Sequence, residues 1–172
     1  MNVLMIVLRL IHIFSGIFWV GVSFFNIRYL QPSIQATAPD GQKVMQHLTQ
    51  RTNFTNVVYG AATLTMLSGL IMYGYLFEFR MEAMTSPYGL VLGIGGISGI
   101  IAWLVALTAI RSIISQMGTV GKAIQEQGGP PTPEQAAILG ELSARLTRLG
   151  RVGLLLMTIA VIGMASAQYV DF

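Results

Sequence analysis

The chain has 172 residues, of which 53% are apolar and only 10% are charged, and its mean hydropathy is +0.66. A soluble domain usually carries about a quarter charged residues, so this composition predicts an integral membrane protein. Cysteine is absent and histidine occurs twice, which excludes disulfides, thiolate metal sites and any histidine-rich metal cluster within one chain. The net charge of +3 comes from basic residues beside apolar runs, which indicates membrane topology and no nucleic-acid partner.

Four runs are long and apolar enough to cross a hydrocarbon core of about 30 Å as helices. They cover about residues 4–27, 55–77, 88–110 and 152–170. The first run lacks a basic n-region and a small-residue cleavage site, so we expect a retained span and not a removed signal peptide. Residues 1–172 are therefore predicted to form one all-α domain in the lipid bilayer, a bundle of four transmembrane helices.

Lysine and arginine lie mainly on one side of the predicted membrane. Eight of them fall in or beside the loops 28–54 and 111–151, whereas the loop 78–87 holds only Arg80. The positive-inside rule then places both long loops in the cytoplasm and both termini outside. The expected location is the plasma (inner) membrane.

The loop 111–151 is predicted to be a cytoplasmic helical hairpin. The sequence GGPP at 128–131 stops a helix, and TPEQ at 132–135 has the spacing of a capping box with a proline at the first helical position. We expect the third span to continue to about Gln127 and a second helix to return from Thr132 into the fourth span. A similar helical lead-in is expected from about Gln42 into the second span.

The first span carries one polar face. At 100° per residue its polar side chains share an arc of about 120°; they are Arg9, His12, Ser15, Trp19, Ser23 and Asn26. Polar groups that faced lipid would stay unpaired, so this arc is expected to point into the bundle or toward a partner. A second stripe, centred on Tyr59 of the second span, is expected to face it and includes Thr63, Met66 and Tyr73.

The depth of His12 suggests two interpretations. It lies roughly 12 Å from the outer end of its helix, at 1.5 Å per residue, and glycines of the other three spans fall near the same depth: Gly69, Gly96 and Gly163. One interpretation is room for a flat macrocycle among the helices. The other is close helix packing, because the third span also holds two GxxxG pairs.

The first interpretation assigns haem b to this level. His12 would be the axial ligand, Arg9 would lie one turn outward beside an acidic group such as a propionate, and Trp19 would share the face. The alternative for His12 is a structural imidazole, hydrogen-bonded to a hydroxyl or a carbonyl, and for Trp19 it is packing. Ionisable residues within a membrane are candidates for function by default.

A second axial ligand is harder to assign. His47 precedes the second span on the opposite side, more than ~20 Å from His12 by helix rise, so one chain is not expected to hold a haem between two histidines. Methionine, water or another chain would complete the coordination, and Met66, Met72 and Met164 lie at usable depths. A copper site of His12, Met66 and Met164 also stays open, because thioethers suit Cu(I).

The stretch HIFSGIFWVGVSFF at 12–25 resembles the opening helix of a loose superfamily of small membrane proteins. These are the urate oxidase amino-terminal membrane domain, the copper-resistance D family and the haem-binding protoporphyrinogen oxidases. The segment LSGL at 67–70 is similar to the end of their second helix. The resemblance implies a cytochrome-b-like bundle in which His12 is a haem-ligand candidate. The sequence lacks the membrane-embedded lysine of the protoporphyrinogen oxidases and the CxxCH motif of some urate oxidase relatives, so the resemblance does not by itself support the family's enzymatic activities.

Three functions remain open at this point. The first is a haem-b-binding module for redox or electron transfer. The second is a cofactor-free accessory subunit of a larger respiratory or photosynthetic membrane complex, and the third is copper handling by family analogy. No Ser/His/Asp arrangement, paired membrane carboxylates or phosphate-binding loop is visible. The seven acidic residues lie outside the spans or at their ends, which argues against proton-coupled transport through a buried carboxylate. A homo-oligomer, or a place as a subunit of a membrane complex, is expected.

Overall fold

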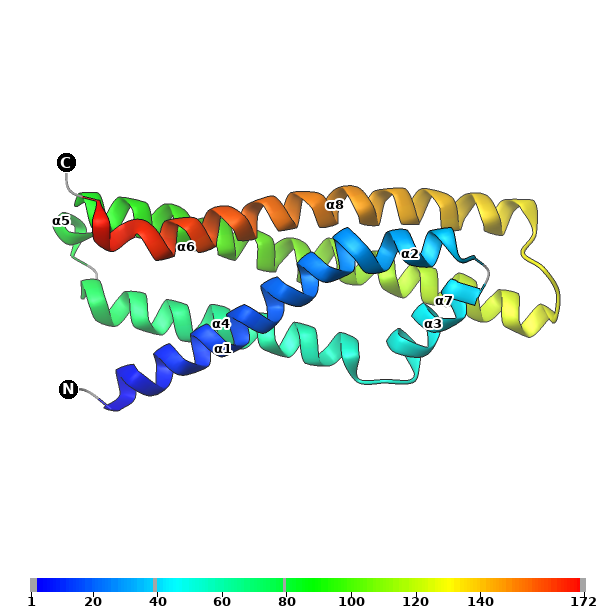
Figure 1. The fold of residues 1–172 in the computed structure, drawn as a ribbon, viewed down its shortest axis with the longest axis horizontal. Coiled ribbons are helices and arrows are strands. Elements are labelled where there is room, and N and C mark those ends of the chain that lie inside the picture. Colours follow the sequence, from blue (N-terminus) through cyan, green and yellow to red (C-terminus); the bar gives the residue numbers. More distant parts are fainter. Residues whose placement is uncertain (1–2, 39, 79, 171–172) are drawn as a thin grey trace.

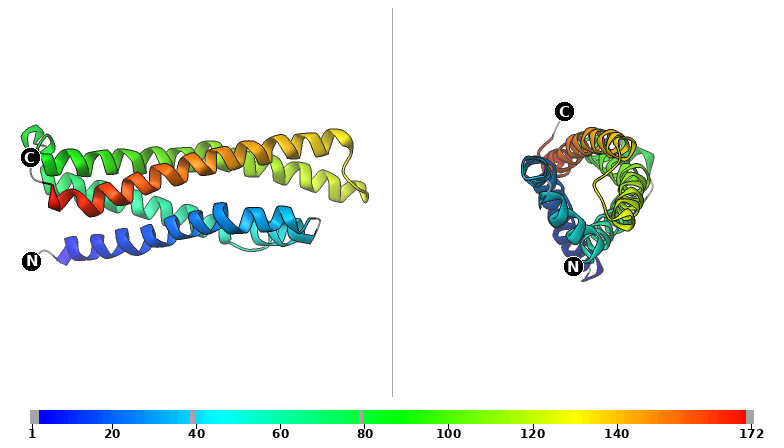
Figure 2. Two further views of the ribbon diagram at one scale, coloured as in Figure 1. Left: turned by 45° about the horizontal axis from the view of Figure 1, so that its top comes forward. Right: turned by 90° about the vertical axis from the view of Figure 1, so that its right-hand side faces the viewer.

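The computed structural model describes residues 3–38, 40–78 and 80–170, and the secondary structure within these ranges is helical. Four helical segments are long and apolar enough to cross a membrane: Val3–Ala36, Phe54–Phe77, Pro87–Gln127 and Pro133–Tyr169. This supports the predicted integral membrane protein with four spans. The four segments run along one common axis and surround it in the end-on view (Figures 1 and 2).

The first helix continues beyond its predicted end at about residue 27. Helix α1 (Val3–Phe25) leads through a π-helical turn, η1 (Asn26–Leu30), into α2 (Gln31–Ala36). In this turn the Gln31 N–H donates to the carbonyl of Asn26, five residues earlier. Pro32 follows and has no N–H to donate, and its ring would clash with a carbonyl of the preceding turn in a regular helix. The wider π turn accommodates the proline without ending the helix.

The second span has a separate lead-in helix. Helix α3 (Asp40–Gln50) is followed by a break at residues 51–53, and α4 (Phe54–Phe77) then forms the span. The predicted lead-in is therefore helical but is not continuous with the span. Glu78 adopts a left-handed conformation with φ 46° and ends α4. The short helix α5 (Met81–Met84) leads toward the third span.

The third and fourth spans form the predicted long hairpin. Helix α6 (Pro87–Val105), the π turn η2 (Ala106–Ile110) and α7 (Arg111–Gln127) are continuous. Gly128 then takes φ 67° and closes the helix. The capping box at Thr132 and Gln135 begins α8 (Pro133–Ser166), which continues into η3 (Ala167–Tyr169). The predicted stop at 128–131 and restart at Thr132 are confirmed.

The bundle consists of two helix pairs. Helix α1 packs along α4, and α6 packs along α8, while fewer contacts join one pair to the other. Figure 2 shows the α6–α8 pair beside the α1–α4 pair. One apolar cluster takes residues from all four helices and holds the pairs together: Trp19, Ala62, Met66, Ala102 and Met157. Trp19 is only 4% exposed and is the largest side chain of this cluster.

Candidate functional site

His12 lies at the interface between α1 and α4, with one ring nitrogen engaged. Its Nδ1 atom is 2.8 Å from the backbone carbonyl oxygen of Thr65. A carbonyl can only accept, so Nδ1 carries the ring proton and donates it. Among the hydrogen bonds of the described residues none uses Nε2. With the proton on Nδ1, Nε2 is the ring nitrogen whose lone pair could bind a metal.

Hydroxyl groups surround this hydrogen bond and join the two helices. The Thr65 hydroxyl lies 2.9 Å from Ser15 Oγ and 2.8 Å from the carbonyl oxygen of Ala61. Ser15 in turn donates to the carbonyl of Ile11. Ser68 Oγ lies 3.5 Å from His12 Nδ1. These groups satisfy one another inside an apolar environment, where an unpaired hydroxyl would be costly.

Glycine provides the space for the imidazole. A Cβ atom added at Gly69 would lie 2.9 Å from Cε1 of His12, closer than real Cβ contacts, and 3.1 Å from its Nδ1. The ring therefore packs directly on the backbone of α4. Ala61, Thr65 and Gly69 follow one another at four-residue spacing, a small-residue pattern typical of membrane helix interfaces. This pattern marks the face of α4 that meets α1.

The predicted pairing of polar stripes is wrong in one respect. The stripe centred on Tyr59 faces the third span and not α1. Thr63 accepts a hydrogen bond of 3.2 Å from Trp103 Nε1, and the Arg111 guanidinium lies 5.8 Å from the Tyr59 ring centroid. The side chains of Met66 and Tyr73 lie beside glycines of α6. The larger residues of this stripe thus lie on the α6 side of α4, and Thr65, Ser68 and Gly69 lie on the α1 side.

The three glycines predicted at the depth of His12 have different surroundings. Gly69 holds the His12 ring. Gly163 lies against α6, since an added Cβ would be 3.0 Å from the Cα atom of Gly95, so α6 and α8 touch backbone to backbone there. At Gly96 an added Cβ would meet nothing within 4 Å. Close packing thus accounts for Gly69 and Gly163, and open space remains only at Gly96.

The other predicted site residues are spread over the bundle. Arg9 is exposed on α1, one turn from His12. Trp19 and Met66 lie in the core cluster, and the Met66 methyl would be 3.2 Å from a Cβ on Gly99. Met164 is partly buried on α8, where its backbone nitrogen lies beside Gly95. Neither methionine has a described contact with His12. Within residues 3–38, 40–78 and 80–170, no group of three or more His, Asp or Glu side chains could hold a metal.

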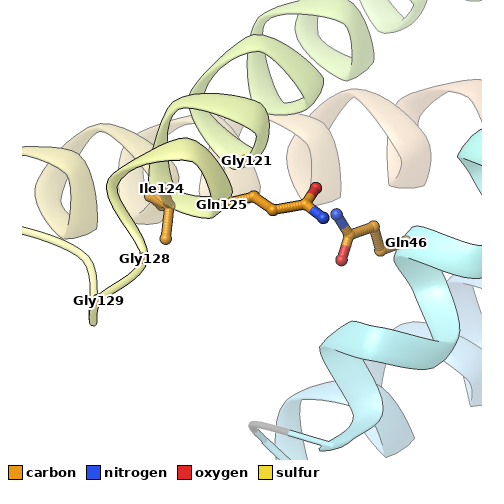
Figure 3. A pocket seen from close by; sticks show the side chains of 6 residues that line it. All are labelled: Gln46, Gly121, Ile124, Gln125, Gly128 and Gly129. Atoms are coloured by element: carbon orange, nitrogen blue, oxygen red, sulfur yellow. The ribbon is translucent and has the colours of Figure 1, made fainter.

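Two polar features lie away from His12. Asn26 Oδ1 and Gln31 Oε1, at either side of the first π turn, are buried and have no hydrogen-bond partner in the described chain. At the far end of the hairpin, a groove of about 380 Å³ separates α3 from α7. Figure 3 shows the amides of Gln46 and Gln125 facing each other across it. Its other lining residues are Gly121, Ile124, Gly128 and Gly129, so the groove offers no titratable or nucleophilic group.

The His12 arrangement is therefore the part of the described chain with the clearest chemical capacity. It combines a fixed tautomer, a lone pair on Nε2 and a hydroxyl network that orients the ring. No family model, curated protein or solved structure matches this chain.

Proposed function

We propose that this protein is a membrane-embedded haem-b-binding module for electron transfer, with His12 as an axial ligand. The observation that carries the proposal is the hydrogen bond of 2.8 Å between His12 Nδ1 and the Thr65 carbonyl. Histidines that bind metals usually donate their other ring N–H to a carbonyl or carboxylate, which fixes the tautomer and makes the ligand nitrogen more basic. His12 has this arrangement.

The surrounding residues fit the group in part. Haem b would supply reversible one-electron chemistry at its iron. Arg9, exposed one turn from His12, would be available for a propionate. Gly96 leaves open space, whereas Gly69 and Gly163 are filled by packing. His12 would provide one axial ligand, oriented by its hydrogen bond to Thr65. The second ligand would come from a methionine, from water or from another chain.

The test is an absorption spectrum of the purified protein, oxidised and dithionite-reduced. It would be recorded for the wild type, His12→Ala and His47→Ala, all produced with ample haem. His47 is the only other histidine and is exposed on α3, so it is a matched control. We expect a Soret band that shifts on reduction, persists in His47→Ala and is lost in His12→Ala. A wild-type protein without a chromophore would refute the proposal.

A cofactor-free accessory subunit is the second candidate, and the packing of α1 favours it. Only 6% of the most apolar stretch of the first span is buried, so most of this helix is open to lipid or to a neighbouring subunit. The Gly69 and Gly163 contacts also need no cofactor. On this proposal His12 is a structural hydrogen-bond donor, the wild type has no chromophore, and His12→Ala changes only stability. Copper handling would instead give a bound metal without a Soret band.

We also propose the orientation that the basic residues favour. The end of the bundle that carries the long loops would face the cytoplasm, with the two termini outside, in the plasma membrane. Protease accessibility of residues 128–131 in intact cells and in inverted vesicles tests this orientation. We expect cleavage only in inverted vesicles. Cleavage in intact cells would show that the long loops face outward, opposite to the proposed orientation.

A further inference from the structure

Four arginines mark one level of the bundle, at the end that carries the long loops. Three lie in different spanning segments, Arg28 in η1, Arg111 at the start of α7 and Arg151 in α8, and Arg51 lies just before the remaining segment, ahead of α4. All four are exposed. We name these four residues the arginine collar.

Contacts between the helices place the collar at one level. A Cβ at Gly150 would lie 3.3 Å from two side-chain atoms of Ile27, so Arg151 and Arg28 are chain neighbours of two residues in contact. Helix α8 also packs against η2, directly before Arg111. The antiparallel register of α1 on α4, fixed by His12 beside Thr65 and Gly69, sets the start of α4 opposite η1.

Carboxylates are lacking around the collar. In the described part of the chain the one ion pair joins Lys43 to Asp40, 2.6 Å apart, and it includes no collar residue. The nearest acid along α8 is Glu141, ten residues from Arg151 and so roughly 15 Å away by helix rise. Glu126 and Glu134 lie farther out, on either side of the turn between α7 and α8. Positive charge is thus concentrated where the apolar spans end.

We propose that the arginine collar binds the phosphate headgroups of anionic phospholipids in the leaflet at this end. Arginine presents a planar array of donors that suits phosphate oxygens. The position decides the partner, because the collar surrounds the bundle where apolar helix surface gives way to polar residues, at the depth of the headgroups. Each basic residue near an anionic membrane surface contributes roughly fivefold in affinity, so the four act together.

The test compares two variants that lose equal charge. The collar variant replaces three collar residues with glutamine: Arg28, Arg51 and Arg151. The control variant replaces three basic residues farther along the same end with glutamine: Lys43, Lys122 and Arg145. The wild type and both variants would be titrated with phosphatidylglycerol or phosphatidylcholine in mixed micelles. Bound lipid is counted by native mass spectrometry, and the thermal unfolding midpoint is measured in parallel. Circular dichroism of each sample reports whether the variant is folded.

We expect the wild type and the matched control to retain phosphatidylglycerol in preference to phosphatidylcholine and to unfold at a higher temperature when it is bound. The collar variant should bind phosphatidylglycerol on the order of a hundredfold more weakly. Equal binding of the two lipids by the wild type would overturn the proposal and point to an acidic protein partner. Equal losses in the two variants would overturn it as well, since net charge and not the collar would be the cause. If the collar variant is unfolded, Arg28→Lys with Arg151→Lys keeps the charge and should keep the preference.

Discussion

The two helix pairs of this bundle are held together by different means. Between α6 and α8, glycine brings the backbones into contact, and the atoms nearest to a Cβ on Gly163 would be backbone atoms of α6. Between α1 and α4, an imidazole and several hydroxyls fill the space, and the atoms nearest to a Cβ on Gly69 would be those of the His12 ring. The α6–α8 interface is therefore apolar and made of backbone contacts. The α1–α4 interface is hydrogen-bonded and made of side chains that can change rotamer, and we call it the adjustable interface.

The difference shows where this molecule can do chemistry. Backbone contact at Gly95 and Gly163 leaves no side chain that could bind or react. At the other interface, the Thr65 carbonyl accepts a proton from a ring whose second nitrogen remains available. Burying a polar group in a membrane interior costs free energy unless the group is paired. Here the hydrogen bond to Thr65 determines which ring nitrogen of His12 carries the proton. The following variants test this contrast.

Gly163→Ala should have the largest effect. The new methyl group would lie 3.0 Å from Gly95 Cα and 3.1 Å from the Val91 carbonyl oxygen, and backbone cannot move aside locally. We expect a loss of about 1–3 kcal/mol in the free energy of unfolding, measured by chemical or thermal unfolding in detergent. Gly153→Ala on the same helix is the control, because a Cβ there meets nothing within 4 Å. Equal stability of the two variants would contradict a backbone contact.

Thr65→Val removes a hydroxyl and keeps the shape of the side chain. It should lower the free energy of unfolding by roughly 1 kcal/mol, the scale of one hydrogen bond between membrane helices, because Ser15 loses its neighbour on α4. Thr158→Val is the matched control, since that exposed hydroxyl donates only to Leu154 within its own helix. If both variants lose the same stability, the Ser15–Thr65 contact does not join the helices.

Gly69→Ala repeats the first substitution at the adjustable interface. The methyl group would press on a side chain that can rotate, so we expect a loss below about 1 kcal/mol. The hydrogen bond to Thr65 should change more than stability does, and nitrogen NMR of the imidazole reports it through the Nδ1 and Nε2 shifts. Gly60→Ala, where a Cβ meets nothing within 4 Å, should leave these shifts unchanged. Unchanged shifts in Gly69→Ala would show that the His12 ring does not pack against Gly69.

Asp40→Asn changes neither interface and should have the smallest effect. The hydrogen bond and the charge of Lys43 lower the pKa of the Asp40 carboxyl from its ordinary 3.8. A folded-state pKa below the unfolded one adds stability above about 3.8, and this contribution is lost as pH falls through the folded-state pKa. The protection factors of the α3 amides, which correct for the intrinsic pH dependence of exchange, should therefore fall in acid for the wild type and depend less on pH in Asp40→Asn. An identical pH dependence in both would show that the exposed pair does not stabilise α3.

The sequence predicted the architecture better than it predicted the contacts. Apolar run length and the capping box at Thr132 are local signals, so the four spans and the long hairpin could be found from them. The partner of each helix face is not a local property. Tyr59 and Thr63 form a more prominent stripe than Ala61, Thr65 and Gly69, yet the smaller residues meet α1. Pro32 also suggests an end to the first helix, and only the π turn shows how the helix continues.

The pairing of the helices also has a consequence for how the chain is made. In each pair the two partners are consecutive spans: α1 precedes α4, and α6 precedes α8. A ribosome-bound chain can thus complete the His12–Thr65 interface while the second half is still being synthesised. We expect the glycine interface to form later as a second hairpin and the cluster around Trp19 to join the two units last. The order of the helices thus favours biogenesis in two steps.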